Sequence, residues 1–116
     1  MRQFTTPEQT AKLIELGVGF RPALIWKEPF EGRDTIIYNH FSIGELIEML
    51  PVYCWYKYGD RAFRALIQIK FYLARWHIVY RKIEEGHCGH LYDCGSDELV
   101  DALCDMIVRL KEEGVI

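Results

Sequence analysis

Hydrophobic positions recur along the chain with two periods, and each period predicts a different kind of element. The first period is helical, because Leu13 and Leu16 lie three residues apart on one face. Thr6 precedes this stretch and Gln9 follows three residues later, which is the spacing of a capping box. We therefore predict a helix over residues 7–16.

The second period is that of a β-strand, and two runs rich in β-forming residues show it. They cover 23–27 and 35–38, and the connection between them contains Pro29 and Gly32. Pro22 and Pro29 bracket the first run, which suits a strand at a sheet edge. The pattern predicts a β-hairpin.

Two further helices are bounded by their own capping signals. Ser42 and Glu45 form a second capping box, and Pro51 ends that short helix. Ser96 is predicted to cap the last helix, which Gly114 ends. The apolar stripe of this last helix is Leu99, Leu103, Met106 and Leu110.

Residues 61–83 fit both periods. Apolar residues at steps of three and four indicate one packed helix, whereas Phe63, Ala65 and Ile67 alternate with polar residues as in a strand. Two strands would need a turn at 72–75, which contains no Gly, Pro, Asn or Asp. The pattern alone leaves one helix and two strands open.

Size and composition indicate a single domain over residues 1–116. The chain has 116 residues and half of them are hydrophobic, which is enough for one core. The sequence shows neither an export signal nor an apolar window long enough to cross a membrane, so we expect a cytoplasmic protein without membrane association. The cysteines are then expected as free thiols, with Cys54 and Cys104 in or near the core.

Charge is distributed unevenly, although the net charge is only −3. Residues 57–83 hold seven Lys/Arg against Asp60 alone, whereas residues 84–116 hold two against nine Asp/Glu. The chain therefore has a basic middle and an acidic end.

The segments 4–13, 42–51, 98–103 and 110–116 share a common pattern with other short sequences. Together they resemble a set of short, uncharacterised proteins of gut bacteria and their mobile elements. No activity or cofactor is attached to that set, so the resemblance implies fold alone. It favours two strands over 61–83 and an α+β fold in the order α-β-β-α-β-β-α, an antiparallel sheet with about three helices packed on it.

Reactive residue types occur, but their spacing does not match a known site. His87, Cys88, His90 and Cys94 offer zinc ligands, yet Cys88 and His90 are too close together for a familiar zinc site. His87 and His90 flank Cys88, but no oxyanion-hole signature accompanies them, so we do not expect Cys88 to act as a nucleophile. Two acidic pairs on helix faces, Glu45 with Glu48 and Asp101 with Asp105, fit solvated surfaces. We expect neither catalysis nor a cofactor.

A non-enzymatic interaction protein is the favoured hypothesis, with another protein or a second copy of the chain as its partner. Exposed aromatic and basic side chains would form its partner surface. The residues expected there are Trp55, Tyr56, Tyr58, Arg61 and Arg75. Nucleic-acid binding through the basic, aromatic residues 57–82 is the alternative, and metal binding by the 87–94 loop is a third.

Overall fold

Three helices and six strands make up the part of the chain that the computed structural model describes. It describes residues 1–17, 24–30, 33–82 and 89–116, with the backbone alone for 24–30 and 33–39. The elements are α1 (Pro7–Glu15), β1 (Leu24–Phe30), β2 (Arg33–His40), α2 (Ile43–Met49), β3 (Tyr53–Tyr58), β4 (Arg61–Tyr72), β5 (Arg75–Lys82), β6 (His90–Ser96) and α3 (Leu99–Glu112). The predicted α+β class is confirmed, and the structure adds β3 and β6 to the predicted order.

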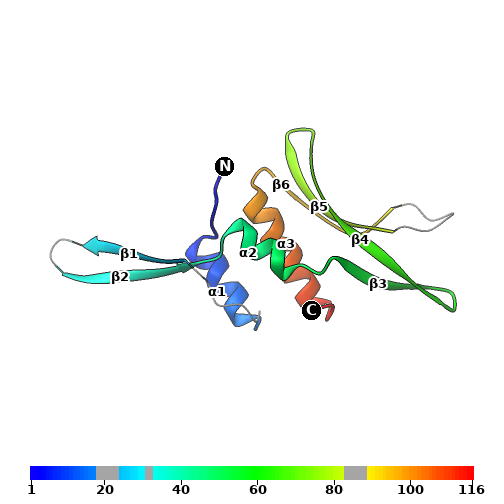
Figure 1. The fold of residues 1–116 in the computed structure, drawn as a ribbon, viewed down its shortest axis with the longest axis horizontal. Coiled ribbons are helices and arrows are strands. Elements are labelled where there is room, and N and C mark those ends of the chain that lie inside the picture. The colour runs from blue at the N-terminus through cyan, green and yellow to red at the C-terminus, as the bar shows by residue number, and fades with distance from the viewer. Residues whose placement is uncertain (18–23, 31–32, 83–88) are drawn as a thin grey trace.

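The strands form two separate antiparallel sheets. β1 pairs with β2 in a two-stranded ribbon, and β3, β4, β5 and β6 form a four-stranded sheet in chain order. The three helices lie between the ribbon and the larger sheet (Figure 1). The predicted first hairpin is therefore present, and it extends away from the helices.

Residues 61–82 form two strands, so the strand interpretation of this region is confirmed. β4 and β5 pair from Ala65↔Lys82 to Tyr72↔Arg75. The turn between them is Leu73-Ala74, and both residues have positive φ, at 51° and 59°. A type I′ hairpin turn has positive φ at both of its central positions, and side chains other than glycine adopt such angles at an energetic cost. Ile83 lies outside the described residues.

The core lies between α3 and one face of the four-stranded sheet. α3 packs on β5, β6 and α2, and its apolar stripe is buried against Ile78 and Tyr80. Cys54 and Cys104 belong to this core, as predicted. The Tyr80 hydroxyl donates a hydrogen bond of 2.7 Å to the Pro51 carbonyl, which connects β5 to the end of α2.

Both predicted capping boxes are present, but the predicted cap of the last helix is wrong. Thr6 with Gln9, and Ser42 with Glu45, exchange the reciprocal side-chain to backbone hydrogen bonds of a capping box. The N-cap of α3 is Glu98, because Ser96 is still paired with Trp76 at the end of β6. Among the described residues, no helix is long and apolar enough to cross a bilayer.

Candidate binding face of the four-stranded sheet

One face of the four-stranded sheet carries no described helix, and strand alternation decides which side chains lie on it. Cys54, Ala65 and Ile78 belong to the core, so their immediate neighbours along each strand point to the opposite side. We call that side the outer face. Its members are Tyr53, Trp55 and Lys57 of β3, the even-numbered residues 62–72 of β4, the odd-numbered residues 75–81 of β5, and Asp93 and Gly95 of β6.

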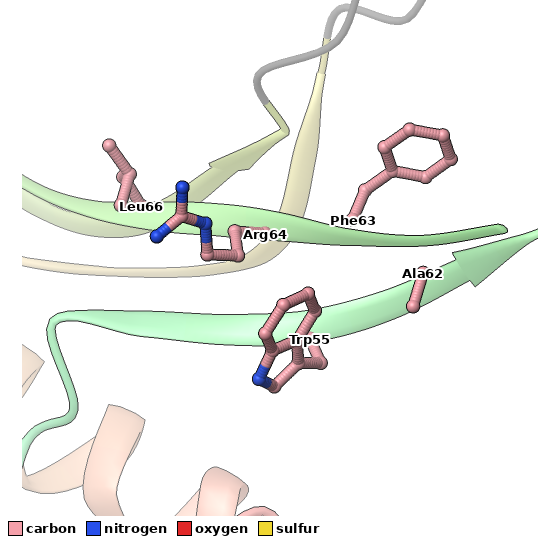
Figure 2. Close-up of a pocket in the computed structure, with 5 residues that line it drawn as sticks. All are labelled: Trp55, Ala62, Phe63, Arg64 and Leu66. Carbon is pink, nitrogen blue, oxygen red and sulfur yellow. The ribbon is translucent and has the colours of Figure 1, made fainter.

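Aromatic rings are exposed on the outer face at the β3 edge. Trp55 is 63% exposed, and its ring meets that of Tyr53 edge-on, with 5.6 Å between centroids. The Arg64 guanidinium lies 5.4 Å from the centre of the Tyr53 ring, which fits a cation–π contact. Figure 2 shows Trp55 and Arg64 beside Ala62, Phe63 and Leu66, which together line an open hollow of about 390 Å³.

A second exposed ring lies at the other end of β4. Tyr72 is 62% exposed and pairs with Arg75 next to the β4–β5 turn. It lies eight positions along β4 from Arg64, the partner of Trp55. At about 3.3 Å per residue, that places the two ring sites roughly 26 Å apart.

Positive charge is distributed along the outer face, around and between these rings. In the part of the chain that the structure describes, Asp93 is the one carboxylate of the face. Arg75 forms an ion pair with Asp97, just after β6, with 3.6 Å between Nε and Oδ1. The other cations of the face form no ion pair with any described carboxylate. They are Lys57, Arg64, Lys70 and Arg81.

Asp93 is positioned between two histidines. Its carboxylate oxygens lie 3.8 Å from Nδ1 of His77 and 3.4 Å from Nδ1 of His90. Gly95 leaves room for the His77 ring, since a Cβ built at position 95 would lie 3.2 Å from His77 Nδ1. The acidic group of the face is thus directed at imidazole nitrogens.

Within the described residues, the acidic helices lie away from the outer face. The three helices together carry seven Asp/Glu against three Lys/Arg, and α3, which packs on the opposite face of the sheet, holds three against two. Asp101 of this helix accepts hydrogen bonds from the side chains of Arg2 and Gln9 at the N-terminal segment. The molecule therefore has a basic side and an acidic side.

The structure divides the sequence-predicted partner surface. Trp55 and Arg75 lie on the outer face, while Tyr58 and Arg61 are exposed at the β3–β4 turn with the opposite orientation. Tyr56 was expected on the surface, and this is wrong, since the residue is 9% exposed and its ring packs 5.7 Å from Phe63. It alternates with Trp55 along β3, so one of the two must face inward.

Several outer-face residues were absent from that predicted surface. Tyr53, Lys57 and Lys70 are among them, and their signal was the period of two along 53–57 and 64–72. This signal could be used only after β3 was recognised as a strand.

Only half of the 87–94 cluster can be placed, because His87 and Cys88 lie outside the described residues. Cys94 is directed toward the core beside Arg109, whereas His90 is exposed next to Asp93. Within the described ranges, no three His, Cys, Asp or Glu side chains are arranged to hold a metal ion.

The described core thiols are poorly suited to nucleophilic chemistry. Burial raises the pKa of Cys54, and it raises the pKa of Cys104 to about 12 with smaller contributions from Asp101 and Asp105. Both thiols are therefore protonated near neutral pH, and the protonated form is the unreactive one.

In each of the two acidic pairs noted in the sequence, one carboxylate makes hydrogen bonds that hold the fold together. Glu45 closes the capping box of α2, and Asp101 holds the N-terminal segment. Burial and, to a smaller extent, Asp101 raise the pKa of Asp105.

We find no match to this chain among protein-family models, curated proteins or solved structures.

Proposed function

We propose that the protein is a non-enzymatic binding module whose working surface is the outer face, and that its partner is negatively charged. The observation that carries this proposal is the set of cations on one sheet face that form no ion pair with any described carboxylate and lie beside exposed rings. Charges and rings exposed together on one sheet face are the usual signature of a binding site, although Val79 in the middle of β5 is fully buried.

Charge also limits what the partner can be. Two copies that met face to face would bring the cations of one copy, among them Lys57, Arg64 and Lys70, close to those of the other. Like charges brought together in this way cost several kcal/mol. Self-association through this face is therefore disfavoured, and an acidic macromolecule fits it better.

The test is retention on heparin, a polyanion, as NaCl is increased. Arg64 and Arg61 make a matched pair, because they lie on the same strand, are both exposed and point to opposite faces. Arg64→Glu should elute at clearly lower salt than the wild type, whereas Arg61→Glu, with the same change of net charge, should elute close to it. Equal shifts for the two variants, or no retention of the wild type at low salt, would contradict the proposal.

A further inference from the structure

The arrangement of rings and cations on the outer face identifies a more specific partner than an acidic macromolecule. We infer that the face binds single-stranded nucleic acid, with bases stacked on Trp55 and Tyr72 and phosphates on Arg64, Lys70 and Arg81. This inference rests on the proposed function, because it names the partner of the same face.

The first argument concerns the rings. Trp55 and Tyr72 are both more than 60% exposed, and each has an arginine as its cross-strand neighbour, Arg64 and Arg75 respectively. A nucleotide carries a flat base and an anionic phosphate within one repeat unit, which matches a ring beside a cation. An acidic protein segment would satisfy the cations but would not need the rings.

The second argument concerns the type of cation. Lys57 and Lys70, on β3 and β4, are two of the cations that pair with no described carboxylate. Lysine is depleted in protein–protein interfaces, whereas it is a common ligand of phosphate. The outer face therefore resembles a phosphate-binding surface more than the centre of a protein interface.

The third argument favours single strands over duplexes. The major groove of DNA is about 12 Å wide and admits a helix or a two-stranded ribbon. Four strands side by side cannot enter it, and paired bases offer no free surface for Trp55 or Tyr72. Unpaired bases can be splayed onto rings on an open sheet, as single-strand binding proteins do.

The distance between the ring sites sets the length of the ligand. Trp55 and Tyr72 are separated by roughly 26 Å along β4. At 3.4 Å per nucleotide for a stacked strand, this span corresponds to about eight nucleotides. A twelve-nucleotide probe is long enough to reach both rings.

The experiment measures fluorescence anisotropy of labelled dT12 and of a labelled 12-bp duplex, at 50 and 200 mM NaCl. We expect dT12 to bind at least tenfold more tightly than the duplex. The affinity should fall with salt with a log–log slope near −2, since about three phosphates are contacted at roughly 0.7 each.

Ring variants separate stacking from simple charge attraction. Trp55→Ala and Tyr72→Ala should each weaken dT12 binding between about fivefold and a hundredfold, while heparin retention stays unchanged. Trp55→Phe keeps a ring and should keep most of the affinity. Tyr58→Ala is the matched control, because Tyr58 is an exposed ring of the same strand with the opposite orientation.

Two results would overturn this inference, and they differ in what they leave standing. If the wild-type protein is retained on heparin, but Trp55→Ala and Tyr72→Ala bind dT12 as tightly as the wild type does, the partner is acidic without being a stacked single strand. If neither dT12 nor heparin binds in a salt-dependent manner, the proposed function fails as well. Far-UV circular dichroism of each variant shows that the fold is retained.

Discussion

Leu73 and Ala74 are held in a backbone conformation that is unfavourable for both. Their φ angles are 51° and 59°, in the left-handed region, which costs roughly 1–2 kcal/mol per residue for side chains other than glycine. Asn-Gly is the usual solution for such a turn. Here Leu73 is 78% exposed next to Tyr72, so these residue types are not explained by burial or by turn preference.

The two turns of the β3–β5 strands allow a reciprocal test of this cost. Gly59 in the β3–β4 turn has a φ of 61°, almost equal to that of Ala74, and a Cβ there would meet nothing within 4 Å. Ala74→Gly should raise the free energy of unfolding by about 1 kcal/mol, and Gly59→Ala should lower it by about as much. Urea unfolding measures both, and changes of the same sign would contradict the argument.

Cys104 links stability to alkaline pH. Its pKa is raised from 9.0 to about 12, so between these values the unfolded chain loses a proton that the folded chain retains. Stability is then fully present below pH 9 and falls as the pH rises, by about 1.4 kcal/mol per pH unit for this group. Unfolding measured at pH 9, 10 and 11 should show a shallower decline in Cys104→Ala than in the wild type. Identical slopes would mean that Cys104 ionises as readily in the folded protein as in the unfolded chain.

At the scale of elements, local signals and long-range pairing differ in how well the sequence reveals them. α1 and α2 could be predicted because Thr6 and Ser42 interact with residues only three positions away. β6 could not, because its Gly-containing sequence has little strand preference of its own and is held by pairing with β5 and by the packing of Tyr92 on Tyr80. The outer face was missed as a unit for the same reason, since it exists only once β3 to β6 are in register.

The caps offer a test at this scale. Thr6→Ala and Ser42→Ala each remove the hydroxyl of a complete capping box and should lower the free energy of unfolding by about 1 kcal/mol. Ser96→Ala should cost clearly less, because Ser96 accepts one bond from the Glu98 amide at 3.3 Å and does not cap α3. Thermal and urea unfolding of the three variants measures this order. If Ser96→Ala lowers the free energy of unfolding as much as the other two variants do, Ser96 acts as a cap of α3 after all.

At the scale of the molecule, shape and charge are both polarised. The radius of gyration is 16.8 Å, whereas a compact chain of this length has about 13 Å. The β1–β2 ribbon accounts for the extension on one side, and the outer face of β3–β6 lies beyond the helices on the other (Figure 1). A ligand on the outer face therefore leaves the ribbon and the N-terminal helix accessible.

The separation of the basic outer face from the acidic helices predicts how molecules interact in crowded, salt-poor solutions. The outer face of one molecule would attract the helices of the next. Such a contact uses two different surfaces, so nothing closes the series after two members. Chains of indefinite length would form, and dissolved ions at cellular strength, which shield charges beyond about 8 Å, would disperse them.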